Sequence, residues 1–533
     1  MNCSSVCAFA LKPCAFGAPL RDFGAWPLSA TEQIELPCLQ CHSNGLIVIS
    51  SDTVRQVGYG FSRMLHRRIG TAPFSVIARA LSQYPAFVLM APVFMMACAA
   101  FALTILFFFP GYLTRDASFV HSYAQEWYLG DWQSPLMTIL WRLIDPISPG
   151  SGSIFLLIAT LYWLSFAIIA GAVARRSAGR AIVVLLLALA PPAFMLLAMI
   201  WRDILFGAVW LLAAAIIYFA TDRTRPLGWA VRALALALVG FGVLLRPNAI
   251  IAAPLLVAYI AWPARFEWKR AALLFIPALL ACYGLIYVVY YVILDVHRNN
   301  PLHQIVVFDL GGITYFTREN QFPVSWSADE EASLITRCYQ PAGWDSYWTL
   351  DPCHFVMDRL ESKSDVIFGT SRLAWSWLRA VAVHPLAYLR HRLTFLSTFL
   401  AGANLTLELE RLKFVDQVPL ARNRYFMAIA ALHDALRSTP LFHKGPWLAL
   451  ATAVAVLAWR GRASPPGTFA ISVAASGIVY ILSFGVFGVA VEFRYAYWCV
   501  LASLAGLIPA LLARRDPPTQ LPGGAPADAP GAK

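Results

Sequence analysis

Charged side chains stand at the ends of several apolar runs, where membrane-spanning helices would begin or end. A carboxylate in such a place can act as a general base on a hydroxyl group, and arginines make charge-assisted, often bidentate bonds to phosphate. Charges kept beside apolar spans are costly, so they mark candidate functional sites. The residues concerned are Asp116, the pair Arg202-Asp203, Arg246, and the run Glu492-Phe493-Arg494-Tyr495. Their types suit group transfer from a phosphate-linked donor, with Asp116 as the general base.

The first polar stretch, residues 110–151, lies between two apolar runs and contains Asp116 near its start. An alternative role for Asp116 is to cap the N-terminus of the helix that follows. Asp131 and Gln133 stand on a turn in the same stretch, where they could bind sugar hydroxyls or a metal. The cofactor requirement therefore stays open, with a divalent metal among the alternatives.

Arg494 is the first choice for the phosphate ligand, because a Glu-x-Arg pair between two apolar runs is costly to keep without use. Arg202 and Arg246 compete for this role. Asp203 begins an apolar run, where an acid also suits a helix N-terminus. The expected substrate-binding set is Asp131, Gln133, Arg202, Asp203, Arg246, Glu492, Arg494 and Tyr495.

The composition is that of an integral membrane protein. The chain has 533 residues, of which 59% are hydrophobic and 13% are charged, whereas soluble domains carry about 25% charged residues. The net charge of +12 is explained by Lys and Arg in cytoplasmic loops. No basic stripe typical of nucleic-acid binding is present, so we expect the lipid bilayer as a partner and no nucleic acid.

The apolar runs predict an all-α fold with about ten transmembrane helices. We expect one transmembrane module over residues 64–294 and a second over 447–513, separated by an insertion over 295–446. The expected spans are 86–109, 153–174, 181–200, 204–220, 228–245, 249–263, 271–294, 447–459, 468–490 and 497–513.

Short loops rich in arginine and lysine follow every second span, as the positive-inside rule requires. We assign these loops and both termini to the cytoplasm. The stretch 110–151, the insertion and all of the charged candidates then fall on the outer face. The tail, residues 514–533, is rich in Pro, Gly and Ala and is expected to be disordered.

The N-terminal 63 residues contain a cysteine motif without a folded context. Cys38, Cys41 and His42 match the spacing of c-type haem attachment, but the topology puts them on the cytoplasmic side, so no haem is expected. We interpret residues 1–63 as a disordered extension or as the result of an incorrectly assigned start. Met64 opens a more typical start, because basic residues follow it shortly before the first span.

The insertion divides into two parts by composition. Residues 295–365 are polar and rich in turn signals, which indicates a small, irregular soluble region. Cys338 and Cys353 lie in this part and are expected to form a disulfide outside the cytoplasm. Residues 366–440 mix aromatic residues with arginines, a pattern typical of amphipathic helices in the membrane interface.

Several of these segments resemble the GT-C superfamily of membrane glycosyltransferases, which includes protein mannosyltransferases and aminoarabinose transferases. The segment FPGYLTRDAS resembles the acidic start of the family's first outer loop, with Asp116 in the catalytic place. GDWQSPL resembles the family's GD-x-HPPL segment but has Gln133-Ser134 where His-Pro is usual. The other segments that carry the resemblance are WRDILF, LLRPNAI, HPLAYLRHRL and the run from Glu492 to Tyr495.

The resemblance implies transfer of a sugar from a polyprenyl-phosphate donor to a glycan, lipid or protein of the envelope. The place would be the outer face of the bacterial inner membrane. This agrees with the outer location of the charged candidates, because nucleotide-activated donors are absent there. Two alternatives stay open: a transporter or flippase of a lipid-linked envelope precursor, and a non-catalytic component of polysaccharide assembly.

Overall fold

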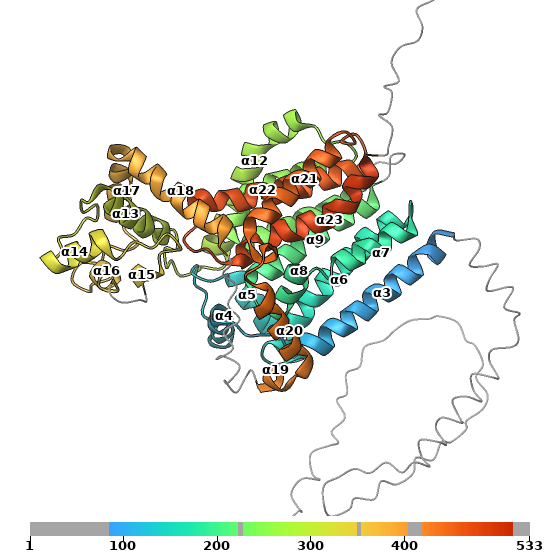
Figure 1. Cartoon of the computed structure of the whole chain (residues 1–533), viewed down its shortest axis with the longest axis horizontal. Helices are drawn as coiled ribbons and strands as arrows, with labels where there is room; N and C mark the ends of the chain where they lie inside the picture. The colour runs from blue at the N-terminus through green and yellow to red at the C-terminus, as the bar shows by residue number, and fades with distance from the viewer. Residues whose placement is uncertain (1–84, 222–226, 349–352, 403–417, 515–533) are drawn as a thin grey trace, which may run out of the picture. The chain divides into compact units, whose positions relative to one another are not determined.

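The computed structural model describes residues 85–221, 227–348, 353–402 and 418–514. All of these residues belong to one compact unit. Over the described ranges, the regular secondary structure is helical apart from three isolated β-bridges. The all-α prediction is therefore confirmed for this part of the chain (Figure 1).

Six of the described helices are long and apolar enough to cross a membrane. Seven spans result if α7 (Ala178–Leu187) and the α8–η2 pair (Pro191–Met195 and Leu196–Ala198) form one span, which bends by 58° at its break. Pro191 and Pro192 stand at that break and lack the amide protons that a continuous helix needs. The chain is a multi-pass membrane protein. The six helices are α3 (Pro85–Phe108), α6 (Gly152–Ala174), α9 (Arg202–Ala220), α12 with its π-helical end η4 (Trp268–Tyr287 and Val288–Ile293), α22 (Pro465–Phe487), and η8 with α23 (Phe493–Ala496 and Tyr497–Ala513).

Three of the ten expected spans correspond to shorter helices. α10 (Trp229–Leu245) has 17 residues and α21 (Lys444–Trp459) has 16, or about 25 Å of helix each, slightly less than the ~30 Å hydrocarbon core. The run expected at 249–263 forms the 3-10 helix η3 (Pro247–Ile251) and the nine-residue helix α11 (Ala253–Ala261). The number of ten spans stays a prediction.

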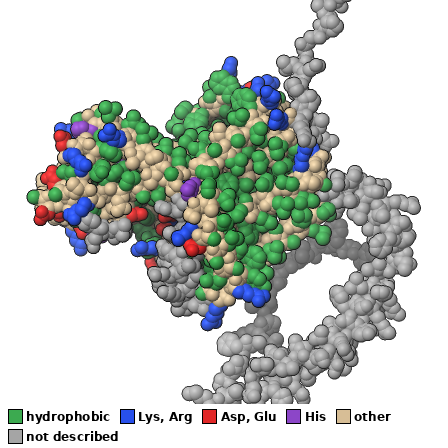
Figure 2. Space-filling view, in the orientation of Figure 1, with side chains coloured by type: hydrophobic (Ala, Val, Ile, Leu, Met, Phe, Trp, Pro, Cys, Tyr) green, Lys and Arg blue, Asp and Glu red, His purple; other side chains and the backbone are tan. Residues whose placement is uncertain are grey.

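Helices α9 and α23 lie at the centre of the bundle. In the most apolar part of α9, 83% of the residues are buried. The corresponding share is 89% for the segment Phe493–Ala513, which ends in α23, and 11% for Trp268–Ile293, which contains α12. α9 packs against α6, α10 and α23, and Gly207 lets Tyr497 approach closely, since a Cβ there would lie 2.9 Å from the tyrosine ring. Because the outer helices expose apolar side chains, the visible face of the bundle is largely hydrophobic (Figure 2).

The insertion forms a separate group of helices beside the bundle. α13 packs against α14, α17 and α18, and α18 continues to α21 and α22 of the bundle (Figure 1). Cys338 and Cys353, the pair expected from the sequence, are joined by a disulfide. The helices of this group are α13 (His303–Thr317), α14 (Ala328–Thr336), α15 (Asp345–Trp348), α16 (Phe355–Leu360), α17 (Ser371–Val383) and α18 (Pro385–Ala401). The next two helices, α19 (Val418–Arg422) and α20 (Arg424–Leu436), lie at the bundle instead, where α20 packs against α3 and α8 (Figure 1).

Candidate active site

Asp116 lies in the first turn of α4 (Arg115–Glu126), which follows a short connection after the end of α3 at Phe108. The N-cap of this helix is Thr114, whose Oγ1 accepts a hydrogen bond from the amide of Ala117 at 3.2 Å. Asp116 is thus not the capping residue, and its carboxylate is directed elsewhere. The first polar stretch continues through α5 (Pro135–Ile144) and η1 (Asp145–Ile147).

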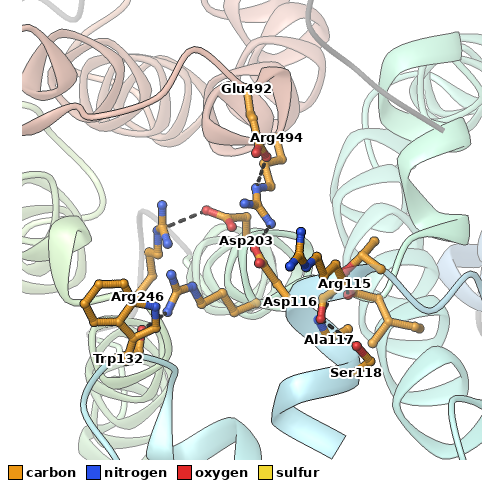
Figure 3. Close-up of polar contacts among 12 residues, drawn as sticks. Arg115, Asp116, Ala117, Ser118, Trp132, Asp203, Arg246, Glu492 and Arg494 are labelled. Carbon is orange, nitrogen blue, oxygen red and sulfur yellow. Dashed lines mark hydrogen bonds and ion pairs between the residues drawn. The ribbon is translucent and has the colours of Figure 1, made fainter. Parts of the chain in front are cut away.

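Arg494 joins two carboxylates from different parts of the chain (Figure 3). Its Nη1 lies 2.6 Å from Oδ2 of Asp116, and its Nε lies 2.5 Å from Oε2 of Glu492. The Arg494 side chain is 9% exposed, whereas that of Asp116 is 39% exposed. The arginine is therefore held in place by protein, and the Asp116 carboxylate stays accessible to a substrate.

A second ion pair lies beside the first and is almost completely buried. Arg246, which ends α10, places Nε 3.0 Å from Oδ1 of Asp203 in the first turn of α9. The ring of Tyr495 lies near both arginines, with guanidinium carbons 5.0 Å (Arg246) and 5.3 Å (Arg494) from its centroid. Both cations gain cation–π stabilisation from this ring.

Arg202 is the arginine of this cluster that has no acidic partner among the described residues. Its Nη1 donates a hydrogen bond of 3.3 Å to the carbonyl oxygen of Trp132, and its side chain lines the same cleft as Asp116. A guanidinium has five N–H donors, so most of the donors of Arg202 are not used by these contacts. Arg202 is the cation best suited to receive an anion.

A narrow cleft runs between Asp116 and the arginines. Its volume of about 10 Å³ corresponds to roughly one water molecule. The cleft is thus small, although the Asp116 side chain at its edge is 39% exposed. The lining residues are Asp116, Ala117, Val120, Gln133, Met137, Ile200, Trp201, Arg202 and Arg494.

The carboxyl groups of this site differ in their pKa. Burial tends to raise the pKa of Asp116, but Arg494, Arg202 and Arg246 together hold it below its usual range. Desolvation raises the pKa of Glu492, and the attraction of Arg494 opposes this rise only in part. The site thus combines a carboxylate that stays ionised with a carboxyl group that accepts a proton more readily.

Asp345 is a further acid near the site that the sequence did not suggest. It begins α15 of the insertion, and its pKa is raised by desolvation and by the negative charge of Asp116, while Arg494 opposes the rise. Asp345 is far from any apolar run in the sequence and belongs to none of the segments that carry the family resemblance.

Asp131 lies outside the cluster, although the sequence placed it among the substrate ligands. Its Oδ2 accepts a hydrogen bond from the Tyr291 hydroxyl at 3.0 Å, and its Oδ1 accepts one from the Asn299 amide at 2.6 Å. These contacts hold the first polar stretch against η4 and the segment after it. Gln133, two residues later, lines the cleft and is 7% exposed.

The described residues contain no group of three or more His, Cys, Asp or Glu side chains that could hold a metal ion. Cys38, Cys41 and His42 lie outside the part of the chain that the structure describes. The described cluster therefore offers carboxylates and guanidinium groups as its chemistry.

The remaining candidates converge although they are far apart in sequence. Asp116, Arg202, Asp203, Arg246, Glu492, Arg494 and Tyr495 contribute to one cluster at neighbouring helix ends. Comparison of the chain with protein-family models, with curated proteins and with solved structures finds no match. The functional assignment accordingly rests on the cluster and on the resemblance of the sequence motifs.

Proposed function

We propose that this protein is a GT-C-type glycosyltransferase that moves a sugar from a polyprenyl-phosphate donor to an envelope acceptor. The acceptor is a glycan, a lipid or a protein. The observation that carries the proposal is the contact between Asp116 and Arg494. Arg202, which forms no ion pair with an acid among the described residues, lines the same cleft. This arrangement provides a base and a phosphate-binding cation at the mouth of a membrane-embedded bundle.

The proposed reaction uses Asp116 as the general base. The acceptor hydroxyl oxygen attacks the anomeric carbon with inversion, and its proton passes to the Asp116 carboxylate. The bond between the anomeric carbon and the phosphate oxygen breaks, and its electron pair goes to the departing polyprenyl phosphate. The phosphate thereby gains one negative charge, which Arg202 and Arg494 stabilise as it develops.

The ion pair between Asp116 and Arg494 gives donor binding a second role in this proposal. A carboxylate held 2.6 Å from a guanidinium is a weak base, because the cation stabilises its ionised form. When the donor phosphate attracts Arg494, this stabilisation decreases and Asp116 becomes a stronger base. Proton removal from the acceptor is thus coupled to the presence of the donor.

The proposed topology puts the cluster on the outer face of the bacterial inner membrane, with ten spans and both termini in the cytoplasm. The positions of the site residues support it. Asp116 follows the end of α3, Arg202 starts α9, Arg246 ends α10, and Arg494 lies just before α23. Since consecutive spans alternate in direction, one membrane face accommodates all four.

The test is the substitution Asp116→Asn, with Glu126→Gln as the matched control. Glu126 is an exposed carboxylate at the other end of α4. Lipid-linked sugars and envelope glycans of a deletion strain are compared by mass spectrometry after complementation with each variant. We expect the wild type and Glu126→Gln to restore the missing glycan and Asp116→Asn to leave a polyprenyl-linked sugar unused.

A well-folded Asp116→Asn variant that restores the glycan fully would end the assignment of Asp116 as the base. A deletion strain with unchanged glycans and lipid-linked sugars would contradict the proposed function as a whole. In the transporter alternative, the lipid-linked precursor would accumulate on the cytoplasmic side of the membrane instead of the outer side.

A further inference from the structure

The segment that carries Glu492 and Arg494 is held by the insertion rather than by the bundle alone. It connects α22, which ends at Phe487, to η8, which begins at Phe493. The carbonyl oxygen of Gly488 accepts a hydrogen bond of 2.7 Å from Nη1 of Arg392 in α18. The next carbonyl, that of Val489, accepts one of 2.9 Å from the amide of Trp344.

Two glycines allow the insertion to approach this connection closely. A Cβ at Gly488 would lie 2.5 Å from the ring of Phe395, and a Cβ at Gly343 would lie 2.7 Å from the carbonyl oxygen of Val489. Gly343 also forms an antiparallel bridge with Ala490. Residues 488–490 of the connection are therefore in close contact with the insertion, just before Glu492 and Arg494.

Arg392 is itself fixed by a buried carboxylate. Its Nη2 lies 2.7 Å from Oδ1 of Asp309, which has no exposed surface and belongs to α13. Asp309 also accepts a hydrogen bond of 2.8 Å from the indole of Trp377 and lies 3.1 Å from Nε2 of His391. A buried ion pair adds little net stability, and one of its established uses is to fix a specific arrangement.

The contacts of Arg392 distinguish two roles: a partner for Asp309 within the insertion, or a link from the insertion to the bundle. Trp377 and His391 already contact Asp309 from within the insertion, so the carboxylate has partners without Arg392. The bond from Arg392 to Gly488 instead leaves the insertion and reaches the bundle. It also ends next to the anchor at Trp344, whose neighbour Asp345 interacts electrostatically with Asp116 and Arg494.

We propose that Arg392, held by Asp309, is a positioning residue that fixes the 488–492 connection so that Arg494 stays in contact with both Glu492 and Asp116. The inference rests on the proposed function for its effect on sugar transfer. The contacts of the insertion with residues 488–490 do not depend on any activity. The insertion thus acts on the active site through the backbone, without touching the substrate.

The experiment measures amide hydrogen exchange in the 488–494 segment of the full chain in nanodiscs. Arg392→Lys is the decisive variant, because a single ammonium keeps the charge beside Asp309 but cannot form the forked contact that also reaches Gly488. Arg392→Gln removes the charge as well. Arg390→Gln is the matched control, since Arg390 is on the same helix and is exposed.

We expect exchange in 488–494 to become at least about tenfold faster in both Arg392 variants and to stay unchanged in Arg390→Gln, by analogy with the loss of one hydrogen bond to a charged group. Exchange in α14 and α16 reports whether the insertion remains folded. Unchanged exchange in 488–494 of Arg392→Lys, with the insertion intact, would overturn the proposal.

Sugar transfer is measured in the same preparations, with Asp116→Asn as the reference. We expect Arg392→Lys to lower kcat/KM for the donor by about tenfold to a hundredfold, as small displacements of binding groups do. If Asp116→Asn transfers sugar normally, only the assignment of Asp116 as the base fails. If the wild type transfers no sugar, the proposed function fails, while the exchange result still decides on the positioning role of Arg392. If Asp116→Asn is inactive and Arg392→Lys equals the wild type in both measurements, only the positioning role fails.

Discussion

Replacing Arg494 by Gln tests the cluster most directly, because this side chain contacts both Asp116 and Glu492. The substitution removes the cation but keeps a polar side chain, which is shorter than that of arginine. Hydrogen bonds to charged groups contribute about 1.5–3 kcal/mol, and Arg494 offers at least one such bond to the phosphate in the transition state. We therefore expect kcat/KM for the polyprenyl-phosphate donor to fall by about 10-fold to 150-fold.

The same substitution should change the pH dependence of the reaction. In the wild type the pKa of Asp116 lies below its usual range, so kcat/KM should be independent of Asp116 protonation above about pH 5. Without Arg494, burial is less opposed and the pKa of Asp116 rises. The rising limb of kcat/KM that follows ionisation of the base should then move to higher pH.

The assay is donor-dependent sugar transfer in proteoliposomes at several pH values, together with binding of polyprenyl phosphate by native mass spectrometry. Arg494→Lys should lose less activity than Arg494→Gln, because it keeps the charge. It should still fall below the wild type, because one ammonium replaces a fork that spans two carboxylates. Arg115→Gln is the control, since Arg115 is an exposed arginine next to Asp116. An Arg494→Gln variant within twofold of the wild type, with an unshifted pH profile, would refute the reasoning.

Two further predictions concern stability. Asp203→Asn leaves the buried cation of Arg246 without its partner and should lower stability by about 3–5 kcal/mol; thermal unfolding in nanodiscs checks this, and a midpoint equal to that of the wild type would contradict it. Cys353→Ser opens the loop that the Cys338–Cys353 disulfide closes, with a sequence separation of 15, and should destabilise the insertion by about 3 kcal/mol on the chain-entropy account. Hydrogen exchange in α14 and α16 measures this effect, and exchange no faster than in the wild type would refute it.

The sequence could indicate which residues meet at the site but not how they pair. Hydropathy locates span ends, and the positive-inside rule assigns Asp116, Asp203, Arg246 and Arg494 to the same face. Neither signal contains the distances between side chains. The pairing of Asp116 with Arg494, and of Asp203 with Arg246, depends on how the helices pack against one another.

Three further features could not be predicted from the sequence, each for a physical reason. The run 249–263 is apolar enough for a span, but Pro247 and Pro254 begin two short helices rather than one long helix. Asp131 shares a turn with Gln133, yet only Gln133 lines the cleft, because Tyr291 and Asn299 hold the aspartate. Asp345 belongs to a polar region without hydrophobic periodicity, so no pattern marked it.

The Asp203–Arg246 ion pair also has a consequence for biosynthesis. The two residues lie at adjoining ends of α9 and α10, which are successive helices that pack together. An acid and a base can thus enter the bilayer as a neutral hairpin soon after both helices leave the ribosome, which avoids the cost of an isolated charge in lipid. Asp116 has no such neighbour, because its partner Arg494 is made near the end of the chain. The cluster can therefore assemble only after the segment with Arg494 has been made, so incomplete chains that lack this segment also lack the Asp116–Arg494 ion pair.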